Sequence, residues 1–74
     1  MDNKTKIDDF VYELLLELPR KYELRKIYSD NGVNAVEIWR RTNGFGRLYV
    51  ISDEDMLEKN KYNRIKEILK HVEN

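Results

Sequence analysis

Histidine and cysteine, two residue types that commonly carry out catalysis, are scarce in this chain. Its 74 residues include one histidine, His71, and no cysteine, which excludes a thiol nucleophile and a cysteine-based zinc knuckle. We expect His71 in the last turn of a C-terminal helix, where a cation interacts favourably with the helix dipole, and the sequence suggests no serine and carboxylate partners for it. The sequence therefore predicts a protein that is not an enzyme and has no catalytic residues.

Two short segments could be taken for ligand sites. Asp53, Glu54 and Asp55 form an acidic cluster, but it lacks the alternating oxygen ligands and the central glycine of a calcium-binding loop. Residues 43–46 contain two glycines without the Lys-Ser/Thr of a phosphate-binding loop, which favours a hairpin loop with Phe45 at its tip. We predict no metal and no cofactor, and we keep the acidic cluster and Phe45 as candidate partner-binding residues.

Hydrophobic spacing predicts the elements that must position these side chains. An apolar stripe at helical period predicts a first helix that ends near Pro19. Apolar alternation from Tyr22 onward, with Asn-Gly pairs at 31–32 and 43–44, predicts strands at about 22–29, 33–41 and 47–52. Ser52, followed by Asp55 three residues later, predicts the cap of a second helix. The stripe of the first helix consists of Ile7, Phe10, Val11, Leu14, Leu15 and Leu18.

These elements give the order α-β-β-β-α in a single domain over residues 1–74. The predicted fold is α+β, with two helices on one face of a three-stranded antiparallel sheet and the other face open. The longest wholly apolar run, residues 14–16, is far shorter than the ~20 residues that cross a bilayer, and the first residues are polar rather than signal-like. We therefore expect a cytoplasmic protein with no membrane partner.

The two hairpins decide which residues share a face. A two-residue type I′ turn at Asn31-Gly32 fixes the first register, and the opposite charges of one of its pairs support it. The predicted pairs are Ile27 with Val36, Lys26 with Glu37, and Leu24 with Trp39.

The second hairpin has two alternatives. A two-residue turn at Asn43-Gly44 would set Trp39 opposite Leu48, whereas a five-residue loop over 42–46 would set Trp39 opposite Tyr49. We favour the longer loop because it gathers aliphatic residues on the helix side. It places Val36, Ile38, Leu48 and Val50 against the helices, and it keeps Arg41 and Arg47 together outside.

With that register, aromatic and arginine side chains would mix on the open face. Such mixtures are typical of binding anchors, although aromatic residues on a small sheet also serve strand pairing alone. The chain is neutral overall, with 14 basic and 14 acidic residues, but residues 20–47 carry seven basic and three acidic ones. The open face is expected to show Trp39, Tyr49, Tyr28 and Ile51 among Arg41, Arg47, Lys26 and Glu37.

Two segments resemble parts of a known family. The segment from Arg47 to Ser52, followed by acidic residues and a helix, and the start from Ile7 to Phe10, are similar to small phage-encoded anti-CRISPR proteins. That resemblance implies a stoichiometric inhibitor that presents acidic side chains in a nucleic-acid-binding cleft; the neutral balance and basic sheet of this chain depart from it. The element order alone also resembles the double-stranded RNA-binding domain, whose Gly-Pro-x-His motif and lysine cluster are absent, so no binding residue is carried over from that family.

The leading interpretation is a binding protein of a phage or mobile element that inhibits or modulates a host protein or nucleoprotein complex. The alternative is a small RNA- or DNA-binding module in which aromatic residues of the sheet stack bases and arginines contact phosphates. A homodimer through the same face is a third arrangement. The candidate partner-binding residues are Trp39, Arg41, Phe45, Arg47, Tyr49, Tyr28, Asp53, Glu54 and Asp55.

Overall fold

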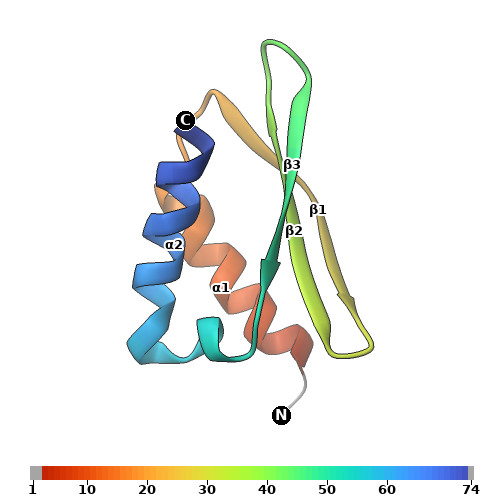
Figure 1. The fold of residues 1–74 in the computed structure, drawn as a ribbon, viewed down its shortest axis with the longest axis vertical. Coiled ribbons are helices and arrows are strands. Elements are labelled where there is room, and N and C mark those ends of the chain that lie inside the picture. Colours follow the sequence, from red (N-terminus) through yellow and green to blue (C-terminus); the bar gives the residue numbers. More distant parts are fainter. Residues whose placement is uncertain (1–2, 74) are drawn as a thin grey trace.

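Two helices cover one face of a three-stranded antiparallel sheet in the computed structural model, which describes the backbone of residues 3–73 and the side chains of residues 6–73 (Figure 1). The strands lie in the order β1-β2-β3, and the opposite face carries no helix. The predicted α-β-β-β-α order and α+β class are confirmed. The elements are α1 (Asn3–Glu17), β1 (Tyr22–Asp30), β2 (Val33–Arg40), β3 (Phe45–Ile51), the 3-10 turn η1 (Glu54–Met56) and α2 (Glu58–Glu73).

The predicted capping box precedes α2 but caps η1. The Ser52 backbone N–H donates to Asp55 Oδ2 at 3.0 Å, and the Asp55 N–H donates to Ser52 Oγ at 3.2 Å. Leu57 then adopts an extended conformation and separates η1 from α2. The side-chain amide of Asn60 donates to the Glu54 carbonyl oxygen at 3.0 Å and ties the first turn of α2 back to η1.

The core lies between the helices and the sheet, and one charged residue joins the two helices. Lys61 of α2 is only 7% exposed, and its ammonium group forms ion pairs with Glu13 of α1 and with Glu58. Hydrogen bonds to Glu13 and then to Glu58 raise the pKa of the Lys61 ammonium group. The apolar core consists of Ile7, Phe10, Val11, Leu14, Tyr22, Val36, Ile38, Tyr49, Ile51, Met56, Ile65 and Ile68.

The first hairpin has the predicted turn and most of the predicted register. Asn31 and Gly32 both have positive φ, 52° and 78°, as a type I′ turn requires. The pairs Ile27 with Val36 and Lys26 with Glu37 are confirmed. The predicted pairing of Leu24 with Trp39 is wrong, because the register shifts between Leu24 and Lys26. Leu24 therefore lies opposite Ile38 and packs against the core.

The second hairpin differs from both alternatives. Arg40 pairs with Phe45, so the loop consists of the four residues 41–44, and Gly44 at its end has a φ of 66°. Trp39 lies opposite Gly46, and Tyr49 lies opposite Val36. Residues 45, 47, 49 and 51 consequently share the helix side, whereas 46, 48 and 50 lie on the open face. The predicted inward direction of Leu48 and Val50, and the outward direction of Tyr49 and Ile51, are wrong.

Candidate functional site

The face of the sheet that no helix covers, here called the outer face, carries the most ordered group of exposed side chains. Its central strand, β2, presents alternate residues to this side, and the register brings residues of β1 and β3 beside them. The outer face consists of Val33, Ala35, Glu37 and Trp39 on β2, Glu23, Arg25, Lys26 and Tyr28 on β1, and Gly46, Leu48 and Val50 on β3.

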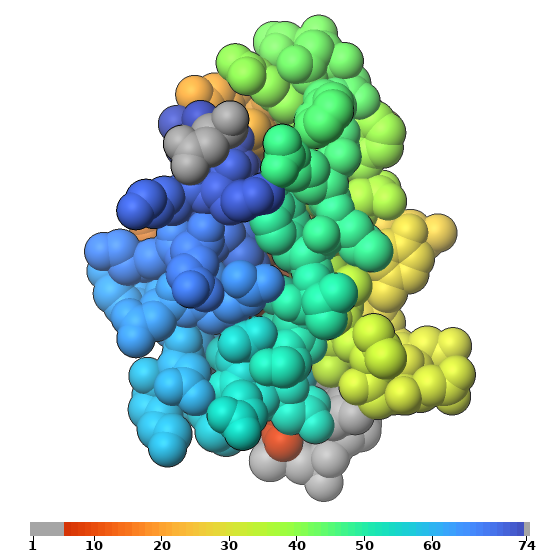
Figure 2. Space-filling model, viewed as in Figure 1, coloured from red at the N-terminus to blue at the C-terminus, as the bar shows by residue number. Residues whose placement is uncertain are grey.

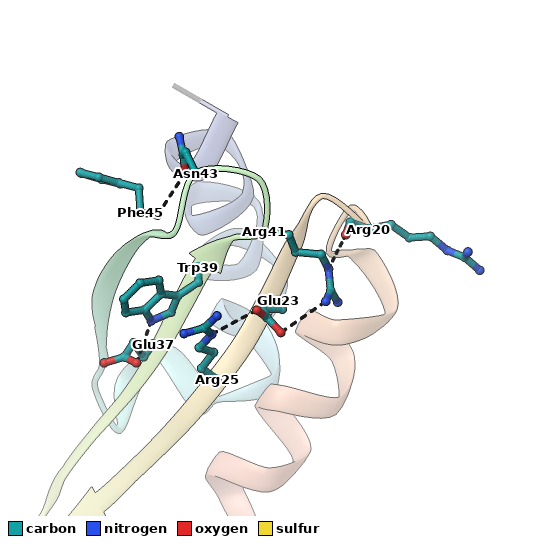
Figure 3. A network of polar contacts seen from close by, with 8 residues as sticks. All are labelled: Arg20, Glu23, Arg25, Glu37, Trp39, Arg41, Asn43 and Phe45. Atoms are coloured by element: carbon teal, nitrogen blue, oxygen red, sulfur yellow. Dashed lines mark hydrogen bonds and ion pairs between the residues drawn. The ribbon is translucent and has the colours of Figure 1, made fainter.

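Trp39 is held in place by three contacts. Its indole lies against Gly46, where an added Cβ would be only 2.6 Å from Cδ2 and 2.7 Å from Nε1 of the ring. The guanidinium carbon of Arg25 lies 4.5 Å from the ring centroid, close enough for a cation–π interaction. The indole N–H donates to Glu37 Oε1 at 2.7 Å, so the ring can neither slide nor tilt freely (Figure 3). Trp39 is thus a preorganised aromatic side chain.

Two carboxylates organise the polar groups around this indole. Glu37 also accepts a hydrogen bond from the Tyr28 hydroxyl at 3.4 Å. Glu23 forms ion pairs with Arg25 at 3.1 Å and with Arg41 at 3.3 Å, as Figure 3 shows. The Arg41 Nε–H donates to the Arg20 carbonyl oxygen at 2.7 Å. The arginines near Trp39 are therefore oriented by partners within the protein.

Apolar side chains continue the outer face along β3. Leu48 is 57% exposed and Val50 is 56% exposed, on an edge strand that no other strand covers. Between Val50 and Tyr28 lies Ala35, which is buried because its larger neighbours extend over it. The result is an apolar strip beside the fixed indole, bordered by the charged groups of β1.

Tyr49 and Arg47, two predicted outer-face residues, lie on the helix side instead. Tyr49 is 7% exposed, and its hydroxyl lies 3.0 Å from His71 Nδ1. Burial raises the pKa of the Tyr49 phenol, and the neighbouring positive charge of Arg47 opposes this change. Tyr49 cannot join Trp39 and Tyr28 in one stacking surface, so the predicted three-aromatic platform for bases is wrong.

His71 was expected to serve only the helix dipole, but it lies in a polar group that links α2 to β3. The Arg47 guanidinium lies 3.3 Å from His71 Nε2. Because a guanidinium group can only donate, a hydrogen bond between these two groups requires Nε2 as the acceptor; Nδ1 then carries the ring proton and donates to the Tyr49 hydroxyl. Spacing along the chain gave no signal for this group, because its members come from two elements.

The acidic residues that were predicted to bind a partner lie away from Trp39. Asp53, Glu54 and Asp55 are at the end of the sheet opposite the β2–β3 loop (Figure 1). Asp55 is occupied by the capping box and by an ion pair with Arg64 at 3.4 Å. The acidic turn and the aromatic group are therefore separate surfaces.

A second apolar surface lies on one flank of α1. Tyr12, Leu15 and Leu16 are all exposed, although Leu15 was predicted to belong to the core stripe. They follow one another at helical spacing. This flank provides matched positions for testing the outer face.

Comparison with protein-family models, with curated proteins and with solved structures found no match. No helix within residues 3–73 is long and apolar enough to cross a membrane. The described residues contain no group of three histidine or acidic side chains placed to hold a metal ion.

Proposed function

We propose that this chain is a non-catalytic docking protein that binds a partner protein through its outer face. The observation that carries the proposal is the fixed indole of Trp39 beside the exposed side chains of Leu48 and Val50. Trp is one of the residue types enriched among those that dominate binding energies at protein interfaces. An apolar strip with charges along one border favours a partner surface with an apolar centre and polar rim.

Preorganisation of Trp39 supports a binding role over simple strand pairing. Ordering a flexible side chain at an interface costs about 0.5–1.5 kcal/mol, and an indole already held by Arg25 and Glu37 largely avoids this cost. Trp39 faces Gly46, the smallest residue, and this lets the ring lie flat on the strand.

The resemblance to anti-CRISPR proteins adds an inhibitory role to this proposal. The partner would then be a host protein or nucleoprotein complex whose activity falls when the domain binds in a one-to-one ratio. In this chain the outer face carries the binding, since the acidic turn is partly engaged by Ser52 and Arg64.

Affinity purification with surface variants tests the proposal. The bait is the wild-type domain, the double variant Leu48→Lys/Val50→Lys, or the control Leu16→Lys, which changes an exposed leucine on α1 instead. We expect wild type and control to recover the same protein, and the double variant to lose it. With that protein purified, the double variant should bind at least ~10-fold more weakly, because lysine side chains break the apolar contact at its centre.

Two results would contradict the outer-face proposal. One is recovery of the same partner by the double variant at wild-type affinity. The other is loss of the partner with Leu16→Lys alone, which would assign binding to the flank of α1. Light scattering on the purified domain identifies the further case of a second copy on the outer face, in which the double variant would change the mass from dimer to monomer.

A further inference from the structure

The end of the β2–β3 hairpin forms a cleft with the last turns of α2 that the docking proposal does not use. The hairpin extends beyond the helices, in the ribbon (Figure 1) and in the space-filling view (Figure 2), so the helix side of its tip is not filled by core residues. The resulting cleft, here called the hairpin cleft, has a volume of about 110 Å³. It is lined by Tyr22, Ile38, Arg40, Asn43, Phe45, Arg47, Tyr49 and Val72.

Register explains why both arginines of the cleft lie on one side. Arg40 pairs with Phe45, and Arg47 pairs with Ile38, so all four point toward the helix side of the sheet. The Arg47 guanidinium carbon lies 5.4 Å from the centroid of the Phe45 ring. The cleft thus combines aromatic and aliphatic walls with two guanidinium groups, an arrangement typical of sites for small ligands.

Arg40 and Arg47 differ from most other arginines of the protein in their ion pairs. Arg25, Arg41 and Arg64 form ion pairs at 3.1 Å, 3.3 Å and 3.4 Å. Among the described residues, no carboxylate pairs with Arg40 or Arg47. The negative end of the α2 dipole offsets only part of this positive charge, because a helix end carries about half a unit charge. The Tyr22 hydroxyl, which donates to the Val72 carbonyl at 2.7 Å, already satisfies one of the terminal carbonyls.

His71, which itself contacts the Tyr49 hydroxyl, holds the Arg47 guanidinium group. Because His71 Nε2 accepts only one of the five guanidinium N–H groups, the others stay free to bind an anion. Guanidinium groups bind carboxylates and phosphates with two parallel hydrogen bonds, and a neighbouring aromatic ring adds a surface on which a planar group can stack.

We propose that the hairpin cleft binds an oxyanion, phosphate or carboxylate, carried on a small planar or apolar body. Arg40 and Arg47 hold the oxyanion, and the ring of Phe45 contacts the body of the ligand. The amide of Asn43 is a further donor at the rim, since its Oδ1 already accepts from the Phe45 N–H at 3.0 Å. This binding is independent of the outer face, because it uses the opposite side of β3.

Heteronuclear NMR titration of the ¹⁵N-labelled domain tests the proposal with three probes: inorganic phosphate, adenosine monophosphate and sodium benzoate. We expect saturable shifts confined to residues 38–49 and 71–72. Arg40→Gln and Arg47→Gln should each weaken binding at least ~10-fold, the loss expected when one charged hydrogen-bonding partner is removed. Arg20→Gln is the matched control because Arg20 is an exposed arginine outside the cleft, and it should bind as the wild type does.

The three probes separate the sources of the oxyanion. Tighter binding of adenosine monophosphate than of phosphate, lost in Phe45→Ala, supports a phosphorylated ligand with a planar body. Tighter binding of benzoate supports a carboxylate ligand. The proposal is overturned if none of the probes binds at millimolar concentration, or if Arg40→Gln and Arg47→Gln bind as tightly as Arg20→Gln. Amide dispersion in each spectrum verifies folding, and Leu48→Lys/Val50→Lys should leave these shifts unchanged even if the docking proposal fails.

Discussion

Replacing Gly46 with alanine should displace the indole that organises the outer face. The φ of Gly46 is not in the left-handed region, so alanine can adopt the backbone conformation of this position. The conflict is instead between the new methyl group and the middle of the Trp39 ring, 2.6 Å from Cδ2. The ring must therefore rotate away from the strand, which also breaks its hydrogen bond to Glu37.

The magnitude follows from these two losses. Overpacking by one methyl group typically costs about 1–3 kcal/mol. A hydrogen bond to a charged group contributes about 1.5–3 kcal/mol, and half-exposed groups such as these keep less than that. We expect Gly46→Ala to lower the free energy of unfolding by about 2 kcal/mol, and since about 1 kcal/mol shifts Tm by 4–8 °C at this size, to lower Tm by about 8–16 °C.

A double-mutant cycle measures the contact itself. Thermal and chemical denaturation followed by circular dichroism would be compared for wild type, Gly46→Ala, Trp39→Ala and the double variant. If the indole causes the loss, Gly46→Ala should cost almost nothing in the Trp39→Ala background, with a coupling free energy of about 2 kcal/mol. Because Trp39 is the only tryptophan, its fluorescence in Gly46→Ala should also shift toward that of an exposed indole.

Gly44→Ala is the matched control for this cycle. Gly44 has a φ of 66° and nothing within 4 Å of an added Cβ, so alanine there strains the backbone without meeting the indole. Its cost, about 1 kcal/mol, should be the same with and without Trp39. Equal costs of Gly46→Ala in the two backgrounds would refute the argument that Gly46 provides the space for the ring.

Three further predictions concern the helices and their attachment. Because hydrogen bonds raise the pKa of Lys61, its stabilising effect should be complete below pH about 10.4, the ordinary lysine value, and be lost as pH rises through the higher folded value. The stability difference between wild type and Lys61→Met in urea should therefore shrink between pH 9 and 12; an unchanged difference contradicts this. Tyr22→Phe removes the hydrogen bond to the Val72 carbonyl and should lower the free energy of unfolding in urea by about 0.5–1.5 kcal/mol. An unchanged free energy of unfolding would contradict this prediction, because it would mean that water replaces the hydroxyl. Ser52→Ala should cost about 0.5–2 kcal/mol by the same assay because the Asp55 N–H loses its acceptor, and Ser52→Thr should restore most of it.

The element order was predictable because several boundaries had a local chemical cause. Asn31-Gly32 supplies the two positive φ values of a type I′ turn, and Ser52 with Asp55 supplies reciprocal caps. Such signals depend on residues at most three apart, so neither packing nor register is needed to interpret them.

The sequence contained a signal for the register shift in β1, but the assumption of strict alternation concealed it. Leu24 and Ile27 are three residues apart, so both can face the core only if one extra residue is inserted between them. The register shift does this, and it places Arg25 and Lys26 on the same side. Arg25 therefore reaches the Trp39 ring, a contact that regular pairing would have forbidden.

The face of β3 could not be predicted from hydrophobic alternation. Both sets of alternate residues contain large apolar side chains, with Tyr49 and Ile51 in one and Leu48 and Val50 in the other. Burial of Tyr49 depends on His71, which lies 22 residues away and satisfies the hydroxyl. The four-residue loop decides which alternate residues of β3 face the helices, and its length is visible only in the folded chain.

The alternation of β3 makes the two proposed sites separable by experiment. Leu48 projects to the outer face and Arg47 to the hairpin cleft, although they are neighbours on one strand. A change at Leu48 should weaken docking and leave oxyanion binding intact, whereas Arg47→Gln should do the reverse. Because both substitutions lie on the same edge strand, any general loss of strand stability would affect both activities together. A reciprocal pattern can therefore come only from the two faces themselves.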